Sequence, residues 1–379
     1  MNAGVYLHIP FCRSRCSYCD FATGMYESGV AEKYVRAICL ELERWREIEQ
    51  PAPVDTIYFG GGTPSLLAPA QIESILTVVK DRFAVTAGAE MTLEINPGDG
   101  ASRNEFFPRL RELGINRASF GAQTFDDHEL KQLGRTHSAA DVTSTFRQLR
   151  DAGFENINFD LIAALPGQTK AGWKRNLARA LTLRPEHLSL YLLDVHEGTP
   201  LADQIKRGMR TKPDEDLAAE MYATTIETVC AAGYEHYEIS NFCLPGFESR
   251  HNSKYWSGAP YYGFGNSAHS YDGQQLRWAN ERDAAKYVEL IEKKKSSIVE
   301  RTNLSDDEVR SESIFLGLRL MRGIDLENYR AQFGRDLREE YNGELARLSA
   351  AGLIELDDRR LKLTSRGALL SNEVFATLA

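Results

Sequence analysis

The sequence predicts an α/β fold built on parallel strands, with a smaller helical module towards its carboxyl-terminal end. Over the first two-thirds of the 379 residues, short apolar runs alternate with amphipathic segments of helical period. Strand–helix alternation at this spacing is typical of parallel strands joined by right-handed crossovers. From about residue 304 the pattern changes to closely spaced helices. Six strand–helix units fit a barrel, complete or open, and also fit a doubly wound sheet.

The expected elements follow in order along the chain. Strands are expected over 5–9, 56–59, 91–95, 117–120, 157–162 and 187–192, and helices over 30–48, 69–83, 103–113, 139–152 and 172–183. A helix over 212–232 precedes an aromatic, glycine-rich stretch from 234 to 278; helices over 309–320, 326–333 and 337–351 then lead into a two-stranded wing over 352–364. We therefore divide the chain into a core (1–200), an extension (201–300) and a terminal domain (301–379).

The net charge of the chain excludes some classes of function. The chain carries 45 basic and 54 acidic residues, a net charge of −9, whereas a nucleic-acid binder needs a basic face. Residues 304–379 alone hold 11 basic and 14 acidic side chains, so the winged module is expected to be a cap or docking surface rather than a DNA reader. With no apolar run of membrane-span length, no signal peptide and only six cysteines, we expect a cytoplasmic protein.

Three cysteines near the amino terminus form the strongest motif. Cys12, Cys16 and Cys19 are spaced C-x3-C-x2-C, which supplies one thiolate fewer than a [4Fe-4S] cluster usually receives and leaves one iron open for a small molecule. A zinc knuckle would need a second ligand pair a dozen or more residues on, but the next cysteine or histidine is Cys39, within the expected helix. The spacing therefore favours a cluster.

The cysteine spacing resembles the signature of the radical S-adenosylmethionine (SAM) superfamily. In that family the amino and carboxylate groups of SAM occupy the open iron, and an electron from the cluster splits a carbon–sulfur bond to give a 5′-deoxyadenosyl radical. The resemblance implies a partial (βα)6 TIM-like barrel, here with a small winged-helix-like α+β domain at the carboxyl-terminal end. This is the fold class that we expect.

Glycines and polar residues gather where the expected strands end. Three glycines at 60–62 let the backbone approach a ligand closely. Glu94 and Gln123 follow the third and fourth strands, and Asp160 interrupts the fifth. A loop-capping role competes for Glu94, and a structural ion pair competes with ligand binding for Asp160. Arg135 suits bidentate pairing with a carboxylate.

These residues together are similar to the coproporphyrinogen III dehydrogenase-like branch of the radical SAM enzymes, over essentially the whole chain. The resemblance implies contact with SAM for Tyr6, Tyr18, Gly61, Gly62, Thr63, Glu94, Gln123, Arg135 and Asp160. The oxygen-independent oxidases of this branch carry a fourth cysteine two residues beyond the third, where this chain has Phe21, and an extension before the cluster that this chain lacks. The chain instead resembles the haem chaperone branch.

A second motif, at residues 251–256, concerns the binding of haem, a tetrapyrrole. His251 opens the stretch His-Asn-Ser-Lys-Tyr-Trp, which the resemblance associates with haem handling. Imidazole is a common haem ligand, and nearby aromatic rings offer flat surface to a macrocycle. The alternative is that His251 only hydrogen-bonds within an aromatic loop, and His8 and His269 are rival ligands.

The sequence is therefore consistent with three functions. The first is a haem carrier that holds a SAM-ligated cluster, receives electrons from a cellular donor and passes haem to an acceptor protein. The second is an oxygen-independent coproporphyrinogen III oxidase, and the third is a radical SAM enzyme with an unidentified substrate. The carrier is favoured, because Phe21 and the missing extension disfavour the oxidase.

Overall fold

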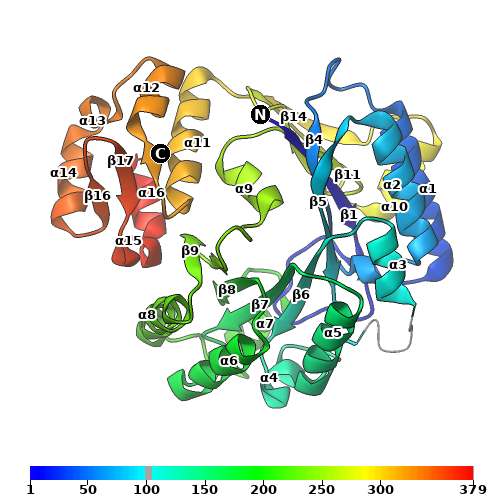
Figure 1. The fold of residues 1–379 in the computed structure, drawn as a ribbon, viewed down its shortest axis with the longest axis horizontal. Coiled ribbons are helices and arrows are strands. Elements are labelled where there is room, and N and C mark those ends of the chain that lie inside the picture. Colours follow the sequence, from blue (N-terminus) through cyan, green and yellow to red (C-terminus); the bar gives the residue numbers. More distant parts are fainter. Residues whose placement is uncertain (99–104, 379) are drawn as a thin grey trace.

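The fold is an open barrel whose wall is one long curved sheet (Figure 1). The computed structural model describes residues 1–98 and 105–378. Six parallel strands form the centre of the sheet: β1 (Ala3–Ile9), β4 (Val54–Gly61), β5 (Val85–Ile95), β6 (Arg117–Gln123), β7 (Ile157–Ala163) and β8 (His187–Leu192). They neighbour one another in chain order without reversal. A doubly wound sheet reverses its order at a switch point, so the barrel alternative is the one observed.

Helices cover the outer, convex face of this sheet (Figure 1). They are α1 (Ser28–Arg44), α2 (Pro69–Arg82), α3 (Phe106–Glu112), α4 (Asp127–Gln132), α5 (Ala139–Asp151), α6 (Lys170–Leu183) and α8 (Glu215–Ala231). The short α7 (Pro200–Lys206) packs on the cysteine loop, where the Leu201 amide donates to the Ser17 carbonyl. The predicted helix 103–113 begins partly outside the described residues. The predicted helix 30–48 ends earlier, at Arg44, because Trp45 leaves the helical conformation and its ring packs on Phe83 and Tyr262.

The stretch that follows α8 supplies both edges of the sheet, which the sequence pattern did not predict. β9 (Glu235–Glu238) and β10 (Asn241–Cys243) extend it beyond β8, whereas β11 (Tyr261–Phe264), β12 (His269–Tyr271), β13 (Leu276–Asn280) and β14 (Ile298–Asn303) extend it beyond β1. Between them, α9 (Arg250–Trp256) lies on the concave side of the sheet against β1 and β4 (Figure 1). α10 (Ala284–Glu292) packs beside α1.

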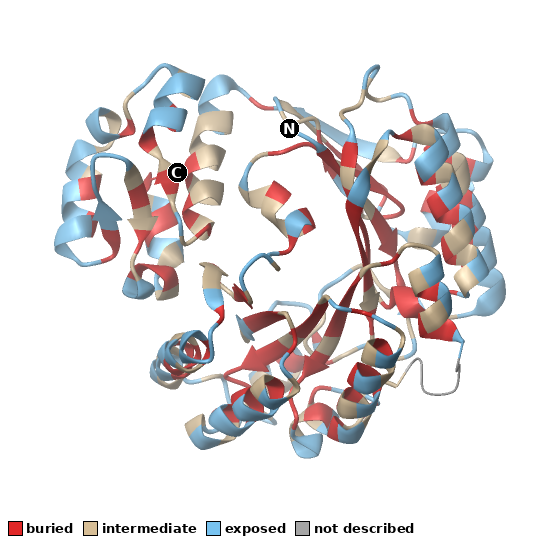
Figure 2. Cartoon of the chain, in the orientation of Figure 1, coloured by how far each residue is buried: buried red, intermediate tan, exposed pale blue. Residues whose placement is uncertain are grey.

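Alternation along the strands separates an apolar outer face from a polar inner one. In β1, Val5, Leu7 and Ile9 are fully buried in the main hydrophobic cluster with residues of α1 and α2. The intervening Tyr6 and His8 face the concave side, as successive side chains of a strand must. Figure 2 shows the strands as a continuous buried layer. The concave face is lined by Tyr6, His8, Thr56, Tyr58, Thr92, Glu94, Arg117, Ser119, Asn158, Asp160, His187 and Ser189. The barrel therefore offers a polar interior to a ligand.

The terminal domain has a three-stranded sheet and holds most of the second hydrophobic cluster, which also includes Tyr222 of α8 and Ile239. Its elements are α11 (Asp306–Arg319), β15 (Ile324–Asp325), α12 (Leu326–Phe333), α13 (Leu337–Glu340), α14 (Asn342–Ala350), β16 (Ile354–Leu356), β17 (Arg360–Leu363), α15 (Ser365–Leu369) and α16 (Ser371–Leu378). The wing has the two predicted strands, and β15 adds a third. The predicted helix 337–351 is divided at Tyr341, where the following Asn-Gly pair has low helix propensity.

An ion pair joins the terminal domain to the barrel. Arg319 at the end of α11 donates to Glu238 of β9 at 2.7 Å, and Glu238 is fully buried. A buried carboxylate needs such a partner, so this pair fixes how the domain closes the open side of the barrel. Among the described residues, no helix is both long and apolar enough to cross a membrane.

Candidate radical SAM site

The three cysteines lie on the loop that leaves β1 at its carboxyl end. Cys12, Cys16 and Cys19 are free thiols, each half-buried. Burial raises the pKa of Cys12 and Cys19, and the charge of the neighbouring thiols adds to the rise. Within the described ranges no three metal-ligating side chains converge as they would on a single ion. A four-iron cluster is wider than an ion and takes its thiolates from separate irons, so three neighbouring free thiols on one loop fit that group.

A chain of hydrogen bonds connects two of these thiols across the barrel. The Thr63 hydroxyl donates to the Cys12 sulfur at 3.6 Å and accepts from the Asn96 amide at 2.8 Å. The Asn96 oxygen accepts from Arg135 at 2.7 Å, and Arg135 also donates to the Cys16 sulfur at 3.4 Å. The cysteine loop is thus held from β4, β5 and the segment after α4. Asn96 was not predicted as a site residue, since the sequence marks it only by its place two residues after Glu94.

The glycine turn after β4 packs directly on the cysteine loop. The Gly62 and Thr63 amides donate to the carbonyls of Ile9 and Phe11. A Cβ on Gly62 would lie 2.7 Å from the Phe11 carbonyl oxygen. Gly61 has φ +111°, a conformation that favours glycine, and a Cβ there would meet the His8 ring at 2.6 Å. Gly62 is therefore required by the close approach of two backbones, and Gly61 by its positive φ and the adjacent His8 ring.

Glu94 faces the concave side just before the end of β5. Its carboxylate accepts from the Tyr58 hydroxyl at 2.8 Å and from the Gly61 amide at 3.1 Å. Burial raises the pKa of Glu94 to about 7, and the nearby Asp160 carboxylate adds to the rise, while the Tyr58 bond opposes it. A carboxylate with a pKa near neutrality is poised to ionise when a cationic group arrives. Of the two roles left open for Glu94, the bond from the Gly61 amide is a loop-capping contact, and ligand binding stays a prediction.

The remaining predicted SAM residues surround the same end of the barrel. Gln123 ends β6 with a left-handed φ of 63° and is buried. Burial raises the pKa of Tyr18, whose electrostatic neighbours include Arg135 and Asp160. Asp160 accepts from the Asn158 amide at 2.7 Å, and no ion pair to it is found in the described part of the chain. The structure thus brings Tyr6, Tyr18, Gly61, Gly62, Thr63, Glu94, Gln123, Arg135 and Asp160 to one end and interior of the barrel.

The histidines proposed as haem ligands occupy different surroundings. His251 of α9 is 1% exposed, and its two ring nitrogens lie 2.8 Å from the Thr56 hydroxyl and 3.0 Å from the Tyr255 hydroxyl. Burial lowers the pKa of His251 to about 3. In this structure it has no free nitrogen for a haem iron, which fits the alternative of a histidine that holds an aromatic loop together. His8 is engaged at both nitrogens as well, whereas His269 is exposed on β12.

Fold and site together define a radical SAM protein: an open (βα)6 barrel with a three-cysteine loop at the carboxyl end of β1. The radical SAM superfamily description matches residues 6–180, and the HemN C-terminal domain description matches residues 304–370. The structure of coproporphyrinogen III oxidase (HemN) from Escherichia coli superimposes with a TM-score of 0.85 at 24% identity, covering 100% of this chain and 90% of that one. This likeness confirms the predicted fold class.

Two relatives place the chain more narrowly. It is 37% identical to heme chaperone HemW of Lactococcus lactis, covering 98% of this chain and 95% of that protein. It is also 37% identical to heme chaperone HemW of Bacillus subtilis, covering 98% of this chain and 97% of that protein. The chain belongs to the HemW family of radical SAM proteins.

Proposed function

We propose that this protein is a haem carrier that binds haem and a SAM-ligated [4Fe-4S] cluster and passes haem to an acceptor protein. The observation that carries the proposal is the near-full-length relationship to two heme chaperones. The complete set of expected SAM-site residues around the cysteine loop supports it. We further propose the cytoplasm as its compartment, because its cysteines are few and three of the six form the cluster motif.

Cys12, Cys16 and Cys19 would hold the cluster, which when bound supplies the electron for reductive cleavage of SAM. The chain's own residues bind and orient the ligand beside the cluster. Arg135 reaches Cys16, Asn96 and the Gly121 carbonyl at once, so its fixed positive charge stands beside the thiolates and beside the place for a ligand carboxylate. Glu94 takes the opposite role and pairs with a cationic or hydroxyl group of the ligand.

The second candidate is a coproporphyrinogen III oxidase. The observation in its favour is the fold shared with the Escherichia coli enzyme, but fold alone does not carry function. Phe21 stands where the oxidases carry a fourth cysteine, and its side chain is 64% exposed beside the cluster loop. An exposed phenyl ring supplies neither a thiolate nor a hydrogen-bond donor at that position. The carrier is therefore the first proposal and the oxidase the second.

A transfer experiment tests the proposal. The reconstituted protein is loaded with haem under anaerobic conditions and mixed with apomyoglobin as a general acceptor, and the Soret band of holomyoglobin is followed over time. We expect transfer that is faster with SAM and reductant than without them. The Cys12→Ala variant should bind haem but lose this acceleration. No transfer to any acceptor, with haem retained indefinitely, would contradict a carrier role.

A further inference from the structure

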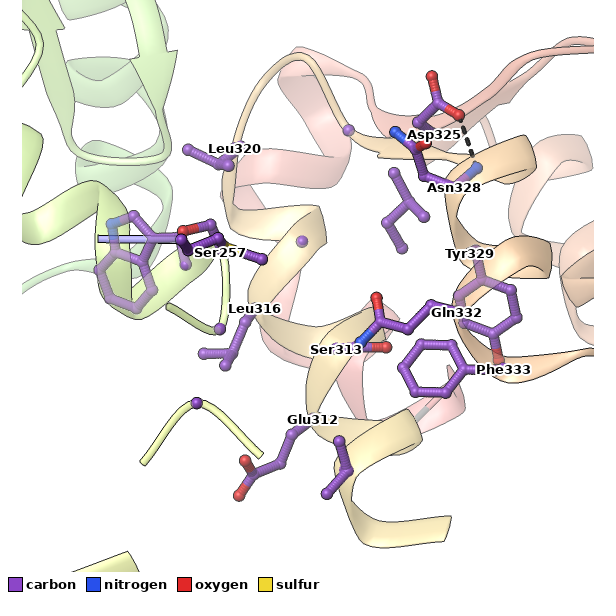
Figure 3. A pocket seen from close by; sticks show the side chains of 18 of the residues that line it. Ser257, Glu312, Ser313, Leu316, Leu320, Asp325, Asn328, Tyr329, Gln332 and Phe333 are labelled. Atoms are coloured by element: carbon purple, nitrogen blue, oxygen red, sulfur yellow. Dashed lines mark hydrogen bonds between the residues drawn. The ribbon is translucent and has the colours of Figure 1, made fainter. Parts of the chain in front are cut away.

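A cavity of about 570 Å³ lies between the barrel and the terminal domain (Figure 3). Its walls come from the carboxyl-terminal end of α9, the turn between β12 and β13, one face of α11, and α12. Pockets of ~300–1000 Å³ are the usual size for ligands as large as a cofactor or drug. The cavity also borders Met1, ahead of β1, whereas the cysteine loop follows the end of β1. Seven strand residues, roughly 23 Å of chain, separate the two regions.

Apolar side chains outside the two large hydrophobic clusters line the walls. Trp256, Leu316, Leu320 and Tyr271 line the cavity and belong to neither of the two large hydrophobic clusters. The position of helix α11 explains why Leu316 belongs to neither cluster. Its residues 309, 312, 313, 316 and 317 line the cavity at the spacing of one helical face, and Leu320 just after the helix continues this wall. The opposite face buries other side chains in the terminal core. Figure 3 shows Leu316 and Leu320 on the cavity side of this helix.

The cavity is biased towards positive charge. Three guanidinium groups, Arg277, Arg322 and Arg360, face two carboxylates, Glu312 and Asp325, a local net charge of +1 in a chain whose net charge is −9. Arg277 pairs with Glu312 at 2.5 Å, and Arg360 lies 3.7 Å from Asp325. No hydrogen bond or ion pair of the Arg322 side chain is found among the described residues, and the side chain is exposed. Guanidinium is the group best suited to bind a carboxylate with two bonds.

Aromatic rings complete the wall. Trp256 packs with the Arg319 guanidinium 4.3 Å from its ring centre, and Arg277 lies 4.4 Å from that of Tyr271. Among the described residues that line the cavity there is no histidine or cysteine, and Met1 carries the one thioether. The Tyr271 and Tyr329 hydroxyls already donate, to the Gln274 carbonyl and to Glu340. A ligand held here is gripped by its flat face and its acidic rim, not through a histidine or cysteine bond to a metal at its centre.

We propose that this cavity is the tetrapyrrole site, with the macrocycle against Trp256 and Leu316 and its carboxylates towards Arg322. The assignment rests on the proposed carrier function and names the place of its cargo. It accounts for the motif around α9 without ligation by His251, because the hydrogen bonds of that histidine to Thr56 and Tyr255 fix the helix that ends in Trp256. A cargo held without a histidine or cysteine ligand is also one that can be released to an acceptor.

The test compares haemin with metal-free protoporphyrin IX, titrated into the reconstituted full-length protein and followed by Soret absorbance. Leu316→Trp fills the cavity and Arg322→Glu reverses its free cation. Each variant should bind both tetrapyrroles about tenfold more weakly. The matched controls are Leu356→Trp in the exposed wing and Arg36→Glu on the exposed face of α1, which should bind as the wild type does. Iron–sulfur absorbance reports that each variant is folded, since the cluster loop is remote from the cavity.

The outcomes separate the two claims. If the wild type binds neither tetrapyrrole, the carrier function itself fails. If the wild type binds but both cavity variants bind equally well, the function stands and the site assignment is overturned. Haemin binding about a hundredfold tighter than protoporphyrin IX would also overturn it, because the iron, rather than the flat face and the carboxylates, would then supply most of the binding.

Discussion

Replacing Glu94 by glutamine should change how the stability of the cluster-free protein depends on pH. Glu94 is half-buried, accepts hydrogen bonds from Tyr58 and Gly61, and has a pKa raised by burial to about 7. In the unfolded chain a glutamate ionises near pH 4.5. Between these two pH values the folded protein holds a proton that the unfolded chain has lost, so the free energy of unfolding falls as the pH rises through this window.

The size of the effect follows from the shift. At about 1.36 kcal/mol per pKa unit, the rise in the pKa of Glu94 from 4.5 to about 7 lowers the free energy of unfolding by about 3 kcal/mol once the pH reaches 8. Most of it, about 2.5 kcal/mol, falls between pH 5 and pH 8. Glutamine keeps the shape and one acceptor oxygen but does not titrate. The Glu94→Gln variant should therefore gain about 2.5 kcal/mol relative to the wild type over this range.

Urea unfolding at pH 5, 6, 7 and 8, followed by circular dichroism with the thiols kept reduced, measures this difference. Glu300→Gln removes an exposed carboxylate from β14 and serves as the control, with a pH dependence parallel to the wild type. If the Glu94→Gln and wild-type curves also run parallel within about 0.5 kcal/mol, Glu94 is not held protonated by its surroundings. The assignment of a poised carboxylate at this position would then be refuted.

Three further changes test the site. Cys12→Ala should abolish iron–sulfur absorbance after reconstitution, whereas Cys230→Ala on the exposed side of α8 should retain it; equal spectra would remove the cysteine loop as the cluster site. Arg135→Lys should weaken SAM binding about tenfold by calorimetry, because an ammonium group cannot replace the three contacts of the guanidinium, and unchanged affinity would argue against this role. His251, whose folded pKa is lowered to about 3, makes the wild type lose about 3 kcal/mol as the pH falls from 7 to 4. His251→Ala should flatten that loss, and an equally steep acid dependence in the variant would contradict its buried neutral state.

The parts predicted from sequence were those with a local signal. Each central strand is an apolar run next to a helix of clear periodicity, and the cysteine loop is contiguous in the chain, so both are found without three-dimensional information. The six outer strands were missed because five of them span three to five residues within or at the end of an aromatic, glycine-rich stretch, where period-two alternation is too short to detect.

Contacts between distant residues lay beyond sequence reasoning. His251 was considered as a haem ligand because it opens a motif, but its ring is held by a hydrogen bond to Thr56, 195 residues away. No sequence pattern predicts that bond. Asn96 joins the cysteine loop to Arg135 only once three strands are side by side. The cavity next to α9 is likewise assembled from segments of the barrel and the terminal domain that the chain keeps far apart.

The most direct test of the carrier account is an anaerobic titration of the reconstituted protein with haem and, separately, with coproporphyrinogen III, with SAM and reductant present. The account predicts one haem bound per chain and no protoporphyrinogen formed. Conversion of coproporphyrinogen III to protoporphyrinogen would contradict it, because the protein would then perform the oxidase chemistry despite Phe21.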